Sequence, residues 1–374
     1  MPVIQETSGK AKKYAFLKYS LNIAGTVYLL FLLAVFTASG LSLSLASWLS
    51  LRLGSPYSIF PVYLLIISLA YALLDFPLNF CHSYLLEHKF SLSRQSFPAW
   101  LWEQVKSFLV AYLMGAVLLG AFYLVIRVYP RQWWLVVSLV WIFFSLVLAR
   151  LTPVLIIPLF FKYKKLEDEE LRRRILNLAD KMKIKLMDCF EIDFSKKTLK
   201  ANAAFLGLGG SKRVLLADTL KEKYTHQEIE VIVAHEFAHY RKKHLLKLIL
   251  INSAITLFTF YLIARTSGFV LGFFSLSGLS EIASLPIVLI YFILFGFLMQ
   301  PWGNLLSRRM ERSADYTALS VTGEKEAFIS TMKKLAEQNL ADTRPHPLIK
   351  FFFYDHPPIA ERIAMADSFQ QRKT

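Results

Sequence analysis

The sequence predicts a mainly α-helical, polytopic membrane protein with a smaller water-exposed part that contains a short β-sheet. Three observations predict this class. First, 55% of the 374 residues are hydrophobic and the mean hydropathy is +0.43, which is more apolar than a soluble protein of this length. Second, several uncharged runs approach 20 residues, the length that crosses about 30 Å of hydrocarbon as a helix. Third, strand-like segments occur only in one polar stretch between those runs.

The apolar runs predict six membrane spans, or seven if residues 41–56 also cross. The six are expected at about 19–40, 57–80, 107–127, 133–160, 245–264 and 284–303, with ends uncertain by about 2 to 4 residues. We interpret residues 41–56 as an interfacial loop because this apolar stretch is rich in serine. The first run is too long for the apolar part of a signal peptide and lacks a small-residue cleavage site, so we expect it to be a true span.

The net charge of +16 does not indicate nucleic-acid binding, because no recognisable nucleic-acid module carries the basic residues. Lys and Arg instead concentrate before the first span, between the second and third, and after the fourth, which is typical of cytoplasmic loops. We therefore expect a cytoplasmic N-terminus and C-terminus, in the plasma (inner) membrane of a prokaryote or the endoplasmic reticulum of a eukaryote. The two cysteines, Cys81 and Cys189, predict neither a disulfide framework nor a metal site.

The chain is expected to divide into two parts. Residues 1–160 form a membrane domain with four spans, and residues 161–374 form a catalytic domain interrupted by the last two spans. Within the second part, residues 167–184 alternate charged and apolar residues at helical spacing, which predicts a surface helix. The segments "DCFEIDF", "ANAAFLGL" and "RVLLAD" predict short strands. The last two are expected to form a hairpin across Gly209 and Gly210.

A zinc-site pattern, His-Glu-x-x-His, stands just before the fifth span. His235 and His239 are four residues apart, so on a helix both rings lie on one face and can reach one ion at about 2.0 to 2.1 Å. Glu236 is placed to act as general base toward the attacking water. Thr225 followed by Glu228 predicts a capping box at the start of this helix. A chance pattern on a buried helix would leave three costly polar side chains.

A catalytic zinc normally has a third protein ligand. His244 is only five residues from His239 and would be turned away from the ligand face, so a hydrogen-bonding or interfacial role suits it better. Glu311 follows the last span in "SRRMERSADYTA", with Asp315 one turn later on the same face. On spacing alone, these two carboxylates fit equally well a metal site and a solvated face on which they pair with Arg308, Arg309 or Arg312.

Topology favours the metal site. Two spans separate His239 from Glu311, so both residues return to the same side of the membrane. Four spans precede His235, which places that side in the cytoplasm if the N-terminus is there. We therefore expect the ligand helix to run into the membrane from a site built at its cytoplasmic surface.

With these residues assembled, the chain resembles the integral-membrane zinc metallopeptidases of the CAAX prenyl protease 1 family, relatives of the HtpX proteases. The resemblance rests on "CHSYLLEHKFSLSRQSFPAWLWEQVKSFLV", "KANAAFLGLGGSKRVLLADTL", "HEFAHYRKKH", "ERSAD" and "DHPPIAERI", and covers nearly the whole chain. It implies a gluzincin-like zinc domain. Eukaryotic members of the family have seven spans around a large chamber, whereas six are counted here, so a closed chamber is a hypothesis.

The resemblance implies roles for eight residues. One Zn²⁺ would be held by His235, His239 and Glu311, with Glu236 as base and Asp315 orienting a ligand histidine. Three more residues would touch the substrate: Asn202 beside an extended substrate strand, and His356 and Arg362 facing the tetrahedral intermediate or the substrate backbone. Without the resemblance, the residues themselves favour structural roles for these three: a turn asparagine, a turn histidine before two prolines and a surface arginine.

The predicted activity is hydrolysis of peptide bonds in peptide or protein substrates at the membrane, with no nucleic-acid partner. A CAAX prenyl protease-like enzyme would cut C-terminal tails, whether or not prenylation is required. An HtpX-like enzyme would instead remove misfolded membrane proteins. A catalytically dead scaffold or transporter is a third alternative. Only Asp75 and Arg150, two charges inside predicted spans, favour it, and the presence of Glu236 argues against it.

Overall fold

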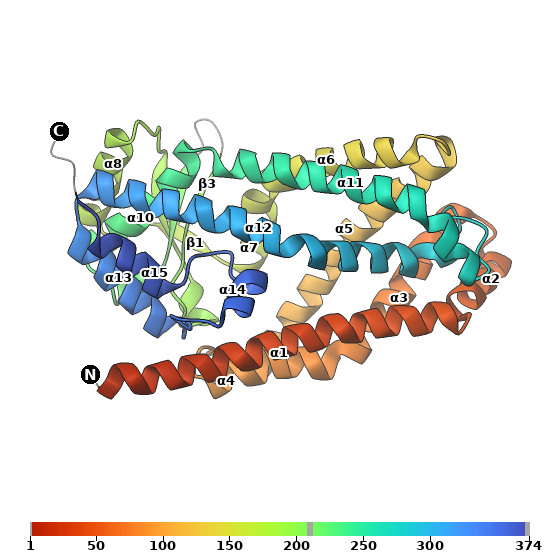
Figure 1. Ribbon diagram of the computed structural model, residues 1–374, viewed down its shortest axis with the longest axis horizontal. Coiled ribbons are helices and arrows are strands. Elements are labelled where there is room, and N and C mark those ends of the chain that lie inside the picture. The colour runs from red at the N-terminus through yellow and green to blue at the C-terminus, as the bar shows by residue number, and fades with distance from the viewer. Residues whose placement is uncertain (1, 208–211, 371–374) are drawn as a thin grey trace.

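In the computed structural model, which describes residues 2–207 and 212–370, long helices extend from a smaller lobe that contains the sheet (Figure 1). Helices α6 (Trp133–Leu151) and α11 (His244–Phe273) lie along one side of the helical part and α1 (Pro2–Ala38) along the other, with α5 (Phe97–Val128) crossing between them. Helix α12 (Leu285–Thr322) contacts both α11 and α1. The smaller lobe contains the sheet and the helices α8, α10, α13 and α15. The architecture is that of the expected polytopic, mainly α-helical protein with a small sheet.

Six helical segments are long and apolar enough to span a membrane. They are Gly9–Ala38, Tyr57–Lys89, Phe97–Val128, Trp133–Phe160, His244–Phe273 and Ile282–Thr322. The six predicted spans are therefore present, but the helices extend beyond the predicted ends. At 1.5 Å per residue, all six segments are longer than about 30 Å. Both α1 (Pro2–Ala38) and α12 (Leu285–Thr322) continue into contact with the smaller lobe, where the rings of Tyr19 and Phe353 lie 5.2 Å apart and α12 packs on α10.

Two of these segments change helix type before they end. Helix α3 (Pro56–Asn79) passes through a π-helical stretch, Phe80–Leu85, into α4 (Leu86–Lys89). Helix α6 (Trp133–Leu151) passes through a second, Thr152–Ile156, into α7 (Ile157–Phe160). A proline lies just before the first stretch and another inside the second. Proline lacks an amide hydrogen, so the regular ladder is interrupted there.

The interpretation of residues 41–56 as a loop is wrong, because Leu41–Leu53 form helix α2. Glycines in the left-handed conformation, Gly40 and Gly54, flank it and turn the chain at both ends. Its serines do not prevent the helix. The buried hydroxyl of Ser42 lies 2.7 Å from the Tyr63 hydroxyl and donates to the Ala283 carbonyl at 2.7 Å. At 13 residues, α2 is too short to span a membrane.

The remaining elements build the smaller lobe. Its strands are β1 (Tyr163–Lys165), β2 (Asp188–Ile192), β3 (Ala203–Leu206) and β4 (Arg213–Ala217), in the order β1-β2-β4-β3. Its helices are α8 (Glu169–Lys181), α9 (Asp218–Lys221), α10 (His226–Arg241), α13 (Lys325–Gln338), α14 (Pro347–Phe353) and α15 (Ile359–Asp367). Two short 3-10 helices, Phe194–Lys196 and Ile282–Ser284, complete the described elements, with α5 (Phe97–Val128) and α11 (His244–Phe273) in the membrane part.

The sheet confirms the three predicted strands and adds β1, whose three residues are too few for a pattern to be read. β3 and β4 pair antiparallel, with Ala203 opposite Leu216 and Leu206 opposite Arg213, as expected for a hairpin. The expected turn at Gly209 and Gly210 lies outside the described residues. Since β3 ends the strand order, its outer edge is paired with no other described strand.

One cluster of buried apolar residues joins the sheet to the helix of the zinc motif. It includes Leu171 and Ile175 of α8, Val214 of β4, and Val233 and Phe237 of α10, all at most 1% exposed. At about 25 cal/mol per Å² of apolar surface, each fully buried side chain of this kind contributes roughly 1.5 to 3 kcal/mol. This packing fixes one face of α10 and leaves the other face for the site.

The helix of the zinc motif does not continue into the membrane as expected. Helix α10 ends at Arg241, Lys243 adopts a left-handed conformation with φ 54°, and α11 begins at His244. A left-handed residue reverses the local helical path, so the fifth span leaves α10 at an angle. As a result, His244 lies next to the site instead of facing away from it.

Candidate metal centre

Helix α10 is positioned at its first turn by the predicted capping box. The Thr225 hydroxyl accepts the amide of Glu228 at 3.3 Å, and the Glu228 carboxylate accepts the amide of Thr225 at 2.7 Å. Glu228 also accepts hydrogen bonds from Ser330 at 2.6 Å and from Lys334 at 2.7 Å. These bonds join the start of α10 to α13 and fix the axial position of the residues that follow.

Helix α12 presents the two acidic residues from the opposite side. Glu311 and Asp315 are buried, 5% and 0% exposed, one turn apart on the face that contacts α10. The alternative in which the neighbouring arginines pair with them does not occur. Arg308 donates to the backbone carbonyls of Lys350 and Tyr354, and Arg312 pairs with Glu361 at 2.8 Å.

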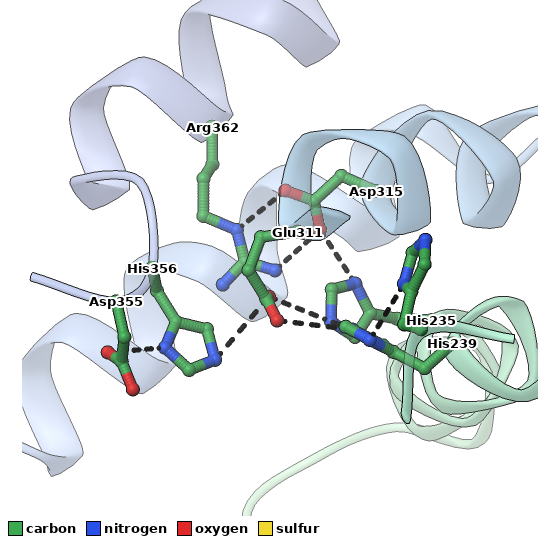
Figure 2. Close-up of polar contacts among 8 residues, drawn as sticks. His235, His239, Glu311, Asp315, Asp355, His356 and Arg362 are labelled. Atoms are coloured by element: carbon green, nitrogen blue, oxygen red, sulfur yellow. Dashed lines mark hydrogen bonds and ion pairs between the residues drawn. The ribbon is translucent and has the colours of Figure 1, made fainter. Parts of the chain in front are cut away.

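Three side chains converge on one point (Figure 2). Nε2 of His235 lies 3.2 Å from Oε2 of Glu311, Nε2 of His239 lies 3.2 Å from Oε1 of Glu311, and the two Nε2 atoms are 3.0 Å apart. One ligand atom from each of the three residues lies within 4.8 Å of the others. Ligands at about 2.0 to 2.1 Å from a tetrahedral zinc are roughly 3.4 Å apart, so the spacing suits such an ion.

The chemistry of the cluster also fits a cation. Oε2 of Glu311 is buried without a hydrogen-bond partner among the described residues, which is costly unless a cation satisfies it. Burial alone would lower the pKa of His235, but Asp315 and Glu311 outweigh burial and raise that pKa to about 9. Positive charge is therefore favoured at this point, and two imidazoles with a carboxylate form a donor set typical of zinc.

The two histidines have different partners behind them. Nδ1 of His235 lies 2.8 Å from Oδ1 of Asp315, close enough for an ion pair although the angle falls outside hydrogen-bond geometry. Arg362 donates to both oxygens of Asp315, at 2.8 and 2.5 Å. Nδ1 of His239 lies 3.1 Å from Nδ1 of His244. His244 thus has the expected hydrogen-bonding role. The break between α10 and α11 at Lys243 brings its ring within reach of His239.

Glu236 faces a cavity of about 130 Å³ beside the cluster. Its carboxylate forms no hydrogen bond or ion pair with the described residues, and burial raises its pKa. The cavity wall also includes Asn202 and Ala203 at the start of β3, and it includes His356. A carboxylate of raised basicity beside an open space is what a general base needs.

The C-terminal element brings two more predicted residues to the site. Nε2 of His356 lies 3.4 Å from Oε2 of Glu311, on the side of the cluster away from His239 (Figure 2). Arg362 borders the same cavity, but its guanidinium is engaged with Asp315, so its main contact is structural. Asp355, which sequence reasoning missed, lies 2.8 Å from Nδ1 of His356 and holds that ring. The sequence offered one signal for this contact, since Asp355 directly precedes His356 in "DHPP".

The two charges inside the membrane part take no part in this site. Asp75 borders a separate cavity between α1 and α3 together with Tyr71 and His82. Arg150 is exposed on the helical surface, and among the described residues neither charge forms an ion pair. They do not pair with each other, so the cavity beside Asp75 is the one observation left for the transporter alternative among the described residues.

Fold and site together define a membrane-embedded metallopeptidase. Comparison with known proteins identifies the family. Residues 165–370 match the model of peptidase family M48, and residues 2–162 match the model described as CAAX prenyl protease N-terminal, five membrane helices. The chain therefore belongs to peptidase family M48 and carries the membrane region of the CAAX prenyl proteases.

Individual relatives agree. The chain is 31% identical over 361 residues to an uncharacterized metalloprotease, YhfN, of Bacillus subtilis, covering 96% of this chain and 84% of that protein. It is 32% identical over 322 residues to CAAX prenyl protease 1 of Saccharomyces cerevisiae, covering 80% and 70%. The crystal structure of Ste24p of S. mikatae superposes with a TM-score of 0.86 at 28% identity, covering 97% of this chain and 89% of that one.

These matches confirm the predicted family, the multi-pass membrane fold and the peptide-bond-hydrolysing, metal-dependent activity. They favour the CAAX prenyl protease-like architecture over the HtpX-like alternative. The division of the chain at residue 160 and the role of each site residue stay predictions.

Proposed function

We propose that this protein is a zinc endopeptidase that cuts the C-terminal tails of membrane-associated, prenylated substrates. The observation that carries the proposal is the convergence of His235, His239 and Glu311 beside a free carboxylate, Glu236, in a cavity bordered by a free strand edge. Zinc held by these three ligands would polarise the scissile carbonyl and make a water nucleophilic near neutral pH.

The residues of the chain supply the remaining steps. Glu236 takes a proton from the attacking water and later gives it to the leaving amine, which its burial and raised pKa favour. Asp315, clamped by Arg362, keeps His235 in the ligand orientation. His356 lies on the open side of Glu311 and, when protonated, donates to the oxyanion that develops there.

The free edge of β3 offers a place for the substrate backbone. An extended peptide can pair with such an edge through main-chain hydrogen bonds, which gives affinity without strict sequence demands. Asn202 precedes β3 directly and its exposed side chain borders the cavity, so it can hold the same peptide near the scissile bond. The prenyl group would lie in the apolar membrane part.

The site is expected on the cytoplasmic side of the membrane, with both termini. The basic loops before the first span and after the fourth support this orientation. The plasma membrane of a prokaryote or the endoplasmic reticulum of a eukaryote would then hold the enzyme. In either membrane, the tail of a lipid-anchored cytoplasmic protein reaches the cavity without crossing the bilayer.

The test uses full-length protein purified in detergent with zinc and two matched fluorogenic peptides. Both end in the same CAAX sequence, but only one is farnesylated on its cysteine. We expect cleavage of the farnesylated peptide only. Glu236→Gln should retain zinc and lose hydrolysis, by at least about 10²-fold for removal of a general base.

Three results would each contradict part of the proposal. Equal cleavage of both peptides would mean a general membrane-surface protease of the HtpX-like kind. Full activity of Glu236→Gln would show that Glu236 is not the general base. Hydrolysis by protein from which a chelator has removed the metal would show that zinc is not required.

A further inference from the structure

A second cavity, larger than the one beside Glu236, adjoins the site on the far side of His356. Its volume is about 320 Å³. Its walls come from three places: the segment Tyr14–Tyr19 of α1, the residues Asn339–Asp342 after α13, and the C-terminal element around His356. His356, Arg362 and Leu335 border both cavities, so the two spaces adjoin at these side chains, and Nε2 of His356 lies 3.4 Å from Oε2 of Glu311. We call this second space the tail cavity.

The strand edge indicates which end of a substrate would enter the tail cavity. A peptide that pairs antiparallel with β3 runs in the opposite direction, and antiparallel pairing is the more frequent arrangement. Its C-terminal end then lies beside Asn202, where β3 begins. The amide of Ala201, the preceding residue, donates to the Asn339 side chain at 3.0 Å, and Asn339 is part of the wall of the tail cavity. The path beyond the scissile bond therefore leads into this cavity.

The tail cavity holds one cation without a carboxylate partner. Lys18 is half-buried in its wall and forms no ion pair with any described residue. A second lysine, Lys200, is not available to a ligand in the same way, because it already pairs with Glu87 at 2.8 Å. A partly buried ammonium without a partner is unfavourable unless an anion arrives.

The acidic side chains of the wall are turned to other partners. The Asp355 carboxylate contacts Nδ1 of His356 at 2.8 Å. The Asp342 carboxylate accepts the amide of Arg344 at 3.1 Å and so supports its own loop. The other cation of the wall, Arg362, is held by Asp315. Lys18 is thus the charge left over for a ligand among the described residues of the wall.

We propose that the tail cavity binds the C-terminal carboxylate of the substrate through Lys18, which makes the enzyme selective for bonds near the end of a chain. The inference rests on the proposed cleavage of C-terminal tails and adds the group that recognises the tail. Apolar wall residues, Phe353, Pro357 and Ile359 among them, suit apolar side chains in the last positions of the substrate.

The experiment compares a free acid with its amide. Two farnesylated CAAX peptides, identical except for a C-terminal carboxylate or carboxamide, are offered to the zinc-loaded, full-length protein. We expect kcat/KM to be about 10- to 100-fold higher for the acid, the factor typical of one charge-assisted hydrogen bond. An amidated peptide with glutamate as its last residue tests whether a side-chain carboxylate can replace the terminal one, and we expect that it does not.

Lys18→Met should lower kcat/KM for the acid to the value for the amide, mainly through KM, whereas Lys18→Arg should keep part of the preference. Lys12→Met is the matched control, because Lys12 is exposed on the same helix and outside both cavities. It should leave both peptides unaffected. Wild-type protein that cuts acid and amide equally well would overturn the proposal. So would a Lys18→Met variant that keeps the preference, or full rescue by the glutamate peptide.

Binding separates this proposal from the proposed function. The same acid and amide are titrated by fluorescence anisotropy into Glu236→Gln, which should not hydrolyse them. Tighter binding of the acid, lost in the double variant with Lys18→Met, supports the carboxylate site even if wild-type protein cuts neither peptide. Equal binding of acid and amide overturns the carboxylate site even if hydrolysis is found.

Discussion

The two ligand histidines are supported in opposite ways. His235 is the more buried, with 11% of its side chain exposed, and it faces an ionic set in which Asp315 is clamped by Arg362 from α15. The side chain of His239 is 27% exposed, and its partner is a neutral ring, His244, at the start of a membrane helix. A deeply buried ligand cannot rely on water for charge balance, so the chain supplies an anion there. The outer ligand needs only an acceptor for its N–H.

The largest effect is expected on the ionic side. Asp315→Asn removes the anion behind His235 and leaves the buried Arg362 without its partner. We expect metal affinity to fall about 10- to 100-fold and the free energy of unfolding to fall by about 3 to 5 kcal/mol. Zinc titration with a competing chelator measures the first, and thermal unfolding of the metal-free protein in detergent measures the second.

Two further variants sharpen this result. Adding Arg362→Met to Asp315→Asn should recover part of the lost stability, because the unpaired charge is gone, but not the metal affinity. Arg312→Gln is the matched control, since the Arg312–Glu361 pair joins the same two helices at the surface and Glu361 keeps its second partner, Lys350. It should change stability by less than about 1 kcal/mol. If it costs as much as Asp315→Asn, burial is not what distinguishes the two pairs.

A smaller effect is expected on the neutral side. With Nε2 of His239 directed at the metal, its Nδ1 carries the hydrogen and donates to His244. His244→Leu removes one neutral hydrogen bond, so metal affinity should fall only about 2- to 10-fold. His244→Gln, which offers an acceptor, should retain more. A loss as large as that of Asp315→Asn would show that the two histidines are supported equally, against the comparison.

The smallest effect on the metal is expected from the far end of α10. Burial alone would raise the pKa of Glu228, but its bonds to Lys334, Ser330 and the Thr225 amide outweigh burial and hold that pKa below the usual value. The ionised carboxylate therefore stabilises the fold above the unfolded-state pKa, near 4.3, and this contribution is lost as pH falls through the lower folded-state pKa.

Glu228→Gln should accordingly destabilise the metal-free protein by roughly 1 to 3 kcal/mol at neutral pH. The gap between variant and wild type should narrow as the pH falls below about 4.3. Unfolding midpoints across this pH range provide the measurement, and zinc affinity at neutral pH should stay within about 2-fold of wild type. A constant gap at every pH would mean that the ionised form of Glu228 is not what stabilises the helix.

Local sequence patterns predicted most of the helices and strands. They did not predict where the helices end or how distant segments contact one another. Hydropathy is read within one segment, so all six spans were predictable. Their ends were not, because α1 and α12 continue beyond the membrane thickness into contact with the lobe. The helix at residues 41–53 was missed for a similar reason. Ser42 looks like a loop residue until its bond to the Ala283 carbonyl, 241 residues away, is known.

The site shows the same division. His235, His239 and Glu236 lie within five residues, and Glu311 and Asp315 within one turn, so spacing alone brought each group together. Which carboxylate faces the metal depended on how α12 packs on α10. The clamp by Arg362 crosses 47 residues of chain, and the approach of His244 depends on one left-handed residue, Lys243. Neither the Arg362–Asp315 contact nor the position of His244 could be predicted from a local sequence pattern.

Metal content tests the central claim most directly. Zinc per chain is measured by elemental analysis in purified wild-type protein, Glu236→Gln and Glu311→Gln, alongside hydrolysis of the farnesylated peptide. The structure predicts one zinc in the first two proteins and none in the third, with hydrolysis in wild type alone. Zinc that remains bound at full affinity in Glu311→Gln, or hydrolysis by that variant at the wild-type rate, would contradict the metal centre described by His235, His239 and Glu311.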